Sequence, residues 1–343
     1  MSIFLTGGLG FIGSHAAIAL LESGQEVVIL DNLCNSQKSV HRQLQFISGK
    51  SIPFYKGDVR DGPLLGAIFS KHSITSVMHF AGLKSVAQSI KDPLLYYDNN
   101  VGGTISLLRA LQEKGIYQFI FSSSATVYGT PVYLPYDELH PTNPINPYGH
   151  SKLQVENILS DLAKSDARWA IACLRYFNPI GAHPSHLIGE LPNDQPNNLM
   201  PYITQVAAKQ RPVLTVYGDD YDTKDGTGER DYIHVMDLAE GHVAALQLIE
   251  KQSGVNMINL GVGKPCSVLE MIATFEKSTG QSVPVQVGKR RDGDLPIYYA
   301  SAQKAKAVLG WEAMRTLGQM CESSWHFQSR HLADLQKSNK SNI

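Results

Sequence analysis

Short apolar runs alternate with longer amphipathic segments along the first half of the chain. The apolar runs are continuous, which is typical of parallel strands buried on both faces of a sheet. The predicted strands are Ile3–Leu5, Glu26–Leu30, Ile52–Tyr55, Ser76–Phe80, Gln118–Phe121 and Ala170–Arg175. The predicted helices between them are Ile12–Ser23, Gly62–His72, Thr104–Lys114 and Tyr148–Lys164. Strands that alternate with helices in this way predict an α/β fold with a doubly wound parallel sheet.

This alternation stops after about Phe177, which predicts a change of architecture. Residues 178–200 are rich in Pro, Asn, Gly and His, and a long loop of this kind is usually functional. The elements predicted next are helix Pro201–Lys209, strand Val213–Tyr217, polar loop Asp219–Glu229, strand Ile233–Val235 returning to the sheet, helix Asp237–Lys251 and strand Met257–Leu260. We therefore expect two lobes that are discontinuous in sequence, and a disordered tail. Their expected bounds are 1–177 with about 230–262, a smaller α/β lobe at about 178–229 with 263–336, and the tail at 337–343.

Composition and charge narrow the class of protein. A chain of 343 residues with 43% hydrophobic content can bury the cores of two domains. Its formal net charge of −1 argues against nucleic-acid binding, which usually needs a basic patch. The four cysteines are scattered without a CxxC pair, which disfavours a disulfide framework or a zinc ribbon and indicates a reducing compartment. No apolar run approaches the ~18 residues of a membrane span, and the first residues lack the basic region of a signal peptide. We expect a soluble, cytoplasmic protein.

Three glycines, Gly7, Gly10 and Gly13, follow the first predicted strand and open the first predicted helix. In this context glycine allows a tight turn and close backbone approach, and the helix N-terminus offers N–H groups to a pyrophosphate. The second predicted strand leads to Asp31, whose carboxylate suits the ribose hydroxyls of NAD and would repel the 2′-phosphate of NADP. The pattern favours a Rossmann-type domain that binds NAD. A glycine turn without a ligand, or with another nucleotide-like cofactor, is the alternative.

Candidate proton carriers lie together in the stretch NPYGHSK, residues 146–152. Pro147 suits the first turn of a helix, which places Tyr148 and Lys152 one turn apart on the same face. His150 lies about 200° around that helix from Tyr148, so we expect a surface or packing histidine there. A phenolate base needs the pKa of Tyr148 lowered by roughly three units, or about 4 kcal/mol, and the Lys152 cation is one source of that stabilisation. Because Tyr-x-x-x-Lys also arises by chance in helices, the pair gains its meaning from the glycine loop upstream.

Ser124 supplies a third candidate group. It closes the run Ser122–Ser124 after the predicted strand Gln118–Phe121, at the carboxyl edge of the sheet where such folds bind ligands. A serine at this edge can hydrogen-bond a substrate hydroxyl and share its proton with the tyrosine. On its own, a run of serines would indicate only a loop.

Five stretches of the chain fit one known pattern: TGGLGFIG, HFAGLK, SSSATVYG, YGHSK and LRYFNPIGAHP. They resemble the extended short-chain dehydrogenase/reductase family. Further stretches narrow the resemblance to its UDP-glucose 4-epimerase (UDP-galactose 4-epimerase) branch: DNLCNS, YYDNNVGGT, NNLMPY, DGTGERDYIHVMDLA, RRDGDLP and W-H-x-Q-S-R-H. The likeness covers about residues 1–332. His150 departs from the pattern, because a lysine often stands at that position.

The resemblance implies three sets of site residues. The catalytic residues would be Ser124, Tyr148 and Lys152. The NAD-binding residues would be Gly7, Gly10, Phe11, Ile12, Gly13, Asp31, Asn32, Leu33, Cys34, Asn35, Ser36, Asp58, Val59, Phe80, Ala81, Gly82, Leu83, Lys84, Asn99, Ser124, Tyr148, Lys152 and Phe177. The UDP-sugar would be held by Ser124, Tyr148, Asn178, Asn198, Leu199, Thr215, Val216, Tyr217, Arg230, Arg291, Asp292, Gly293, Asp294 and Tyr298. The chemistry agrees, because arginine forks suit a diphosphate, Tyr217 can pack on uracil and Asp294 can accept from a ribose hydroxyl.

The implied reaction is the reversible epimerisation of UDP-glucose and UDP-galactose at C4. Tyr148 would take the proton of the 4-hydroxyl, while C4 gives its hydride to tightly bound NAD⁺ and becomes a ketone. The same hydride would then return from NADH to the opposite face, so that each turnover regenerates NAD. The family reads substrate size partly at the position of Tyr298, and a bulky side chain there favours these sugars over N-acetylated ones. Alternatively Tyr298 only packs, or Tyr299 compensates for it.

Other functions remain open at this point. A nucleotide-sugar 4,6-dehydratase needs an extra acid and base, which in the family follow the catalytic hydroxyl, whereas this chain has Ala125 and Thr126 there. A non-enzymatic NAD-binding regulator would not need the set Ser124, Tyr148 and Lys152.

The resemblance also bears on metals and partners. His183-x-x-His186 followed by Glu190 has metal-like spacing, but His183 belongs to the family's GAHP loop, and we expect no metal. The expected partners are the UDP-hexose substrate and a second copy of the chain, paired through the helices around Asn100–Lys114 and Tyr148–Lys164. We expect neither nucleic acid nor membrane as a partner.

Overall fold

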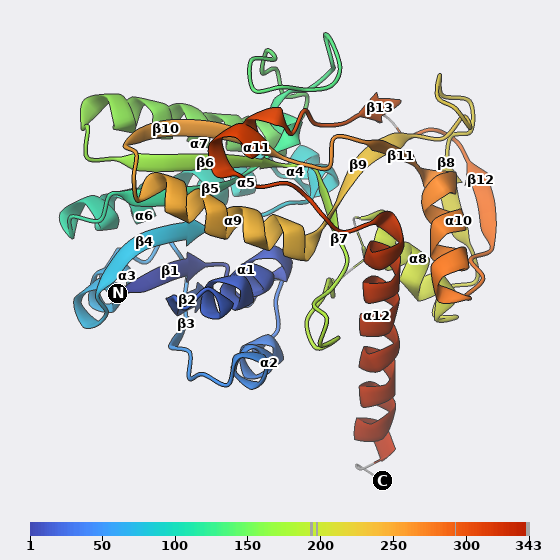
Figure 1. Ribbon diagram of the computed structural model, residues 1–343, viewed down its shortest axis with the longest axis horizontal. Coiled ribbons are helices and arrows are strands. Elements are labelled where there is room, and N and C mark those ends of the chain that lie inside the picture. Colours follow the sequence, from blue (N-terminus) through green and yellow to red (C-terminus); the bar gives the residue numbers. More distant parts are fainter. Residues whose placement is uncertain (193–194, 197, 292, 341–343) are drawn as a thin grey trace.

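Seven parallel strands form the central sheet in the computed structural model (Figure 1). The structure describes residues 1–192, 195–196, 198–291 and 293–340, with residues 337–340 described by their backbone alone. The strands are β1 (Ser2–Thr6), β2 (Glu26–Asp31), β3 (Phe54–Lys56), β4 (Ile74–His79), β5 (Gln118–Ser124), β6 (Ala170–Tyr176) and β10 (Gly254–Leu260). Their order, β10-β6-β5-β4-β1-β2-β3, reverses direction at β1, which lies between β2 and β4. The predicted doubly wound parallel sheet is confirmed, and ligands bind such sheets where the strand order reverses.

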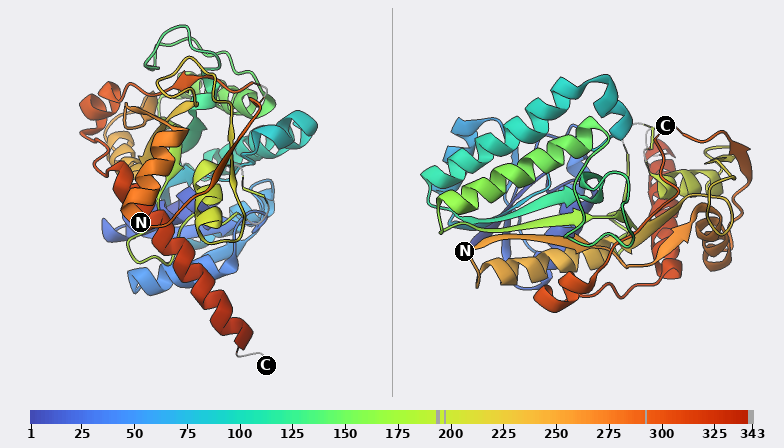
Figure 2. Two further views of the ribbon diagram at one scale, coloured as in Figure 1. Left: turned by 90° about the vertical axis from the view of Figure 1, so that its right-hand side faces the viewer. Right: turned by 90° about the horizontal axis from the view of Figure 1, so that it is seen from above.

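Helices cover both faces of this sheet (Figure 2). One face carries α1 (Phe11–Glu22), α2 (Lys38–Ser48), α9 (Val235–Ile249) and α11 (Gln303–Leu309), and the other carries α3 (Gly62–Lys71), α6 (Gly103–Glu113) and α7 (Pro147–Ser165). The core on the first face contains Ile18 and Leu238, and the core on the second contains Leu65, Leu107 and Val155. The shorter helical segments are α4 (Val86–Lys91), α5 (Pro93–Tyr96), the π-helix η1 (Tyr97–Gly102) and the 3₁₀-helix η2 (Ala125–Val127).

The start of α7 follows from its first residues. Asn146 is the N-cap, and its side-chain oxygen accepts a hydrogen bond from the backbone N–H of Gly149 at 2.9 Å. Pro147 occupies the first helical position, where its missing N–H leaves no unmet bond. The predicted helix start at this proline is therefore confirmed.

Two smaller sheets form the second lobe, on the right in Figure 1. One sheet contains β11 (Pro265–Ser267), β9 (Glu229–His234) and β13 (Ile297–Tyr298), with β7 (Asn178–Ile180) also paired to β9; the other pairs β12 (Val285–Gly288) with β8 (Leu214–Tyr217). Around them pack α8 (Leu199–Ala207), α10 (Val268–Thr279) and α12 (Leu317–Lys340). Ile203, Phe275 and Cys321 belong to a separate core in this lobe.

The structure corrects the prediction that Ile233–Val235 returns to the main sheet. The strand is β9, which pairs with β7, β11 and β13 and belongs to the second lobe. Val235 is already the first residue of α9, because His234 serves as its N-cap and accepts from Met236 N–H at 3.0 Å. The chain therefore crosses to the larger lobe with a helix rather than a strand.

The assignment of all of residues 263–336 to the second lobe is also wrong in part. Helix α11 packs on α9 and β10, and Trp311 joins the core beneath the large sheet. The indole N–H of Trp311 donates to the Asp237 carbonyl at 3.1 Å, which ties this segment to α9.

The backbone of residues 337–340 continues α12, whereas the sequence predicts a disordered tail from residue 337. Residues 341–343 lie outside the described residues.

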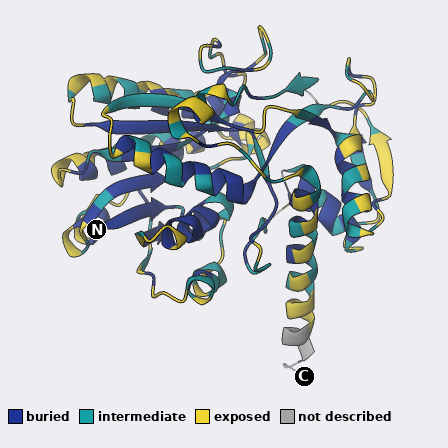
Figure 3. Cartoon of the chain, viewed as in Figure 1, coloured by how far each residue is buried: buried dark blue, intermediate teal, exposed yellow. Residues whose placement is uncertain are grey.

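Burial follows the layers of the fold (Figure 3). The inner strands of the large sheet (β1, β4, β5 and β6) and the inner sides of α1 and α9 are largely buried, whereas much of α12 is exposed. No helix in the described part of the chain is long and apolar enough to cross a membrane.

Candidate functional site

A cavity of ≈ 1510 Å³ lies at the carboxyl ends of the large sheet's strands, where the second lobe faces them. Its lining includes every residue expected to bind NAD or the UDP-sugar except Leu33 and Asp292. Leu33 has a φ of 65°, and its side chain packs against the core on the α1 face rather than into the cavity. Asp292 lies outside the described residues. Segments that are far apart in sequence thus meet in one hollow.

The glycine loop after β1 leaves no room for side chains. Gly7 has a φ of 66°, and a Cβ added there would lie 2.7 Å from the backbone nitrogen of Ala81. A Cβ on Gly13 would lie 2.4 Å from the carbonyl oxygen of Gly7. The N-terminus of α1 therefore stays open to an anion, and no side chain caps it. This cradle fits the pyrophosphate of a dinucleotide.

Asp31 is buried at the end of β2 and already accepts three hydrogen bonds. Its Oδ2 accepts from Leu9 N–H at 3.0 Å, and its Oδ1 accepts from Leu33 N–H at 2.9 Å and from the Ser36 hydroxyl at 2.8 Å. A carboxylate accepts about four hydrogen bonds. Binding of both ribose hydroxyls therefore requires the Ser36 hydroxyl to turn away.

Asp58 forms a second acidic position beside this one. Hydrogen bonds from the Arg60 side chain are the main cause that lowers the pKa of Asp58 to about 2. The Asn32 amide donates to the same carboxylate at 3.1 Å. Asp58 is therefore ionised at neutral pH, and it holds Asn32 on the rim of the cavity.

The loop after β4 is clamped by a residue that the sequence analysis missed. Buried Asn100, in the π-helix η1, accepts from Leu83 N–H at 2.8 Å and donates to the Leu83 carbonyl at 3.0 Å. Its amide also donates to the Ser151 hydroxyl on α7 at 3.1 Å. π-helical turns are rare and often occur at functional sites. This turn presents Asn99 to the cavity while Asn100 joins the Leu83 loop to α7.

Ser124, Tyr148 and Lys152 line the same part of the cavity. The Lys152 Nζ donates to the Ser122 carbonyl at 2.7 Å and lies 5.9 Å from the centre of the Tyr148 ring. The Ser124 hydroxyl accepts from the Thr126 hydroxyl at 3.0 Å. His150 is exposed and does not line the cavity.

Burial shifts both ionisable groups of this set toward their neutral forms. It raises the pKa of Tyr148 to about 12, against a smaller opposing effect of the hydrogen bond with Ser124. It lowers the pKa of Lys152 to about 8. In the protein alone Tyr148 therefore stays protonated at neutral pH, and the lowering of its pKa expected from Lys152 is not among the effects that act on it.

A buried ion pair supports the strand and the helix that carry these groups. Glu156 on α7 accepts from Arg175 on β6 at 2.7 Å and 2.9 Å, and from the Ser123 hydroxyl at 2.6 Å. Arg175 also donates to the Tyr128 hydroxyl at 3.0 Å. The sequence analysis missed this network, although an arginine in an otherwise apolar strand signals a buried partner.

Aromatic rings and arginines line the cavity in the second lobe. The Tyr298 hydroxyl donates to Asn178 Oδ1 at 2.8 Å, and the Arg230 guanidinium lies 4.9 Å from the centre of the Tyr298 ring. The Arg291 guanidinium lies 4.9 Å from the centre of the Tyr217 ring. Salt bridges of 3.4 Å and 3.1 Å join Arg230 and Arg291 to the Asp294 carboxylate. Two guanidinium groups that converge on a cavity suit a diphosphate.

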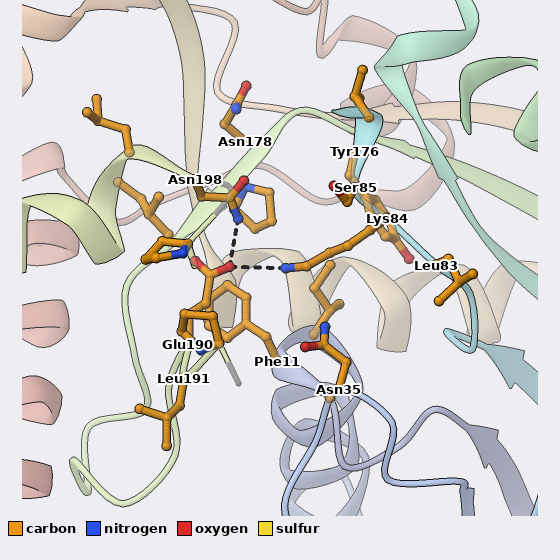
Figure 4. A pocket seen from close by; sticks show the side chains of 18 of the residues that line it. Phe11, Asn35, Leu83, Lys84, Ser85, Tyr176, Asn178, Glu190, Leu191 and Asn198 are labelled. Atoms are coloured by element: carbon orange, nitrogen blue, oxygen red, sulfur yellow. Dashed lines mark hydrogen bonds and ion pairs between the residues drawn. The ribbon is translucent and has the colours of Figure 1, made fainter. Parts of the chain in front are cut away.

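The residues with metal-like spacing point to different partners. His183 Nδ1 lies 2.8 Å from the Ser185 hydroxyl, and the His186 ring packs against His326 with 4.8 Å between centres. Glu190 accepts instead from Lys84 and Asn198 (Figure 4). Across the described residues, no three His, Cys, Asp or Glu side chains gather in a way that could hold a metal ion.

Comparisons with known proteins give a consistent group of relatives. A family model described as GDP-mannose 4,6 dehydratase matches residues 4–324. A UDP-glucose 4-epimerase of Neisseria meningitidis serogroup C is 54% identical over 330 residues, 96% of this chain and 97% of that protein. One from Bacillus subtilis is 50% identical over 332 residues, 97% of this chain and 98% of that protein.

Solved structures give the same picture. A UDP-glucose-4-epimerase from Stenotrophomonas maltophila, with bound NAD and formylated UDP-arabinopyranose, superposes with a TM-score of 0.96 at 49% identity. That likeness covers 97% of this chain and 99% of the other. A UDP-glucose 4-epimerase from Bifidobacterium longum, in complex with NAD+ and UDP, superposes with a TM-score of 0.93 at 47% identity, covering 96% and 98% of the two chains.

Proposed function

Because the chain belongs to the UDP-glucose 4-epimerase family, we propose that it interconverts UDP-glucose and UDP-galactose by NAD-dependent epimerisation at C4. One observation carries the proposal: a single cavity holds the glycine cradle, the set Ser124, Tyr148 and Lys152, and a pair of arginines. A dinucleotide and a nucleoside-diphosphate sugar can therefore lie end to end with the reactive groups between them.

NAD fits the residues of the larger lobe. The glycine cradle accommodates a pyrophosphate without a clash, and Asp31 offers an acceptor to a ribose hydroxyl where a 2′-phosphate would be repelled. When bound, NAD supplies the hydride acceptor for C4, the donor for the return step, and a positive charge that favours an anion beside it. That charge acts against the burial that keeps Tyr148 neutral in the protein alone.

The protein groups then supply proton transfer and orientation. Tyr148 takes the proton of the 4-hydroxyl, and Ser124 positions that hydroxyl or relays its proton. Lys152 is fixed by the Ser122 carbonyl, so its cation stays within one helical turn of the phenol. Arg230 and Arg291 anchor the diphosphate while the ketose turns over, and Tyr148 returns the proton when the opposite face is reduced.

A dehydratase is less well supported, although the matching family model carries a dehydratase description. Elimination across C5 and C6 needs an acid and a base beside the catalytic hydroxyl. The positions after Ser124 are Ala125, which is buried and apolar, and Thr126, whose hydroxyl donates to Ser124. These two side chains therefore do not supply the acid and the base that elimination needs.

The proposal is tested by incubating the purified protein with UDP-galactose and following UDP-glucose by chromatography. We expect both sugars to appear at equilibrium without added NAD or net release of NADH, because the cofactor is regenerated. Formation of a 4-keto-6-deoxy sugar would instead identify a dehydratase. Absence of both products, together with no sugar-dependent reduction of bound NAD, would instead support a non-enzymatic NAD-binding regulator.

Replacement of Tyr298 by alanine should widen the range of sugars. Its hydroxyl bonds Asn178 and its ring contacts the Arg230 guanidinium, so truncation opens the cavity beside both residues. We expect the variant to gain epimerisation of UDP-N-acetylgalactosamine, and the parent protein to favour UDP-galactose by about tenfold or more, the order of a steric discrimination. Equal rates of the parent protein on the two substrates would show that Tyr298 does not limit substrate size.

We further propose a cytoplasmic homodimer that belongs to galactose metabolism, with NAD in the larger lobe and the UDP-sugar against the second. Cys173, Cys266 and Cys321 are buried as free thiols, which supports a reducing compartment. Ile90, Leu94 and Leu95 expose apolar side chains on α4 and α5, which pack against α7, and these exposed side chains support self-association close to that expected helix.

A further inference from the structure

Glu190 bridges two walls of the cavity (Figure 4). Its Oε1 accepts from the Lys84 Nζ at 3.1 Å and from the Asn198 amide at 2.6 Å. Lys84 lies on the loop after β4, and Asn198 immediately precedes α8 in the second lobe. The Glu190 side chain is only 12% exposed, whereas that of Lys84 is 44% exposed, so the bridge runs from the cavity wall to a more accessible lysine.

The position of Glu190 is set by the backbone next to it. Gly189 forms a bridge with Ala182, and a Cβ on Gly189 would lie 2.5 Å from the Phe327 ring on α12. The loop is therefore pressed against α12 immediately before Glu190. The backbone at Glu190 is thus held in place, whereas its carboxylate is oriented by its two donors, Lys84 and Asn198.

The Asn198 side chain bonds to Glu190 instead of capping α8. It occupies the N-cap of α8, where asparagine normally accepts a backbone N–H, but its side chain makes no capping bond. The amide nitrogen instead donates to Glu190, which turns the amide oxygen away from the carboxylate. The second carboxylate oxygen, Oε2, is buried and has no partner among the described residues.

Resting on the proposed function, in which Lys84 contacts NAD and Asn198 contacts the UDP-sugar, we propose that Glu190 is a positioning residue that couples the two ligands. A cofactor that orders Lys84 also orders the shared carboxylate, and through it the amide of Asn198. The second ligand then meets a group that is already in place and binds more tightly. By linkage, UDP must strengthen the binding of NAD by the same factor.

The test uses the NAD-loaded protein and UDP as the probe. For the parent protein, UDP should slow the loss of NAD measured by dilution or dialysis. In Glu190→Gln the UDP dissociation constant should rise about tenfold, the size of one charge-assisted hydrogen bond, and UDP should no longer slow NAD loss. Glu190→Asp keeps the charge on a shorter side chain; it should restore part of the coupling, and it repeats the test if the glutamine variant folds poorly.

A matched control is Glu312→Gln, which removes a Lys306–Glu312 salt bridge of 2.8 Å outside the cavity lining. This variant should keep both the parental UDP affinity and the parental coupling. An unchanged effect of UDP on NAD loss in Glu190→Gln would overturn the proposal, even if overall stability fell. The binding readout is separate from turnover, so a parent protein that fails to convert UDP-galactose would overturn the proposed function instead.

Discussion

Replacement of Tyr148 by phenylalanine is expected to lower epimerase turnover by about 10²- to 10⁴-fold, the usual contribution of a positioned acid–base group. Only the phenolic hydroxyl is removed, and the ring beside Lys152 remains. NAD should stay bound, because the glycine cradle and Asp31 are untouched. The measurements are the rate of UDP-galactose conversion and the NAD released on denaturation.

The matched control for this variant is Tyr133→Phe. Tyr133 is exposed, does not line the cavity, and bonds only to Asp137 in the described hydrogen-bond network. The Tyr133→Phe variant should therefore convert UDP-galactose at the parental rate. If Tyr148→Phe epimerises at nearly the parental rate with full NAD content, another group removes the proton of the 4-hydroxyl, and the assigned base is wrong.

Replacement of Glu156 by alanine should cost about 3–5 kcal/mol of unfolding free energy, because it leaves a buried guanidinium without its partner. Glu156 and Arg175 are almost completely buried, with side chains 1% and 5% exposed. Burial opposes the charge on Arg175, and the pair with Glu156 nevertheless raises the pKa of Arg175 above its ordinary value. A urea titration followed by circular dichroism measures the loss.

Asp161→Ala gives the comparison on the same helix. Asp161 forms a 3.1 Å salt bridge with Lys164, but both side chains are largely exposed, and such pairs contribute about 0–1 kcal/mol. The two variants should therefore differ by several kcal/mol in unfolding free energy. Similar values for both would mean that the Glu156–Arg175 pair adds little to stability.

The large sheet was predictable because its strands are continuous apolar runs, and β6 is buried at every position from Ala170 to Tyr176. The second lobe offered weaker signals. β13 has two residues, β7 and β11 have three each, and β9 opens with the charged pair Glu229–Arg230 before its buried part. Pairing across long sequence separations creates these strands, and a local pattern does not carry that information.

The site residues also divide into those that local motifs predict and those that only the fold brings together. The glycine loop and the Tyr148–Lys152 spacing are local motifs, and the residues they predict do line the cavity, although their roles remain predictions. Asn100 and the Glu156–Arg175 pair acquire their partners only through the fold. The expected phenolate does not form in the protein alone for a related reason. Helical spacing reveals the nearby cation, but only the three-dimensional packing reveals that desolvation raises the pKa of Tyr148.

The contact of Gly189 with Phe327 has a consequence for the order in which the protein is made. The last strand of the large sheet ends at Leu260, so the glycine cradle can form while the chain is still being synthesised. Helix α12, which follows all other described elements, braces the Glu190 loop and adds Arg330 and His331 to the cavity wall. A nascent chain can thus acquire its dinucleotide cradle before this helix exists, and the enclosed site is completed only when the helix emerges.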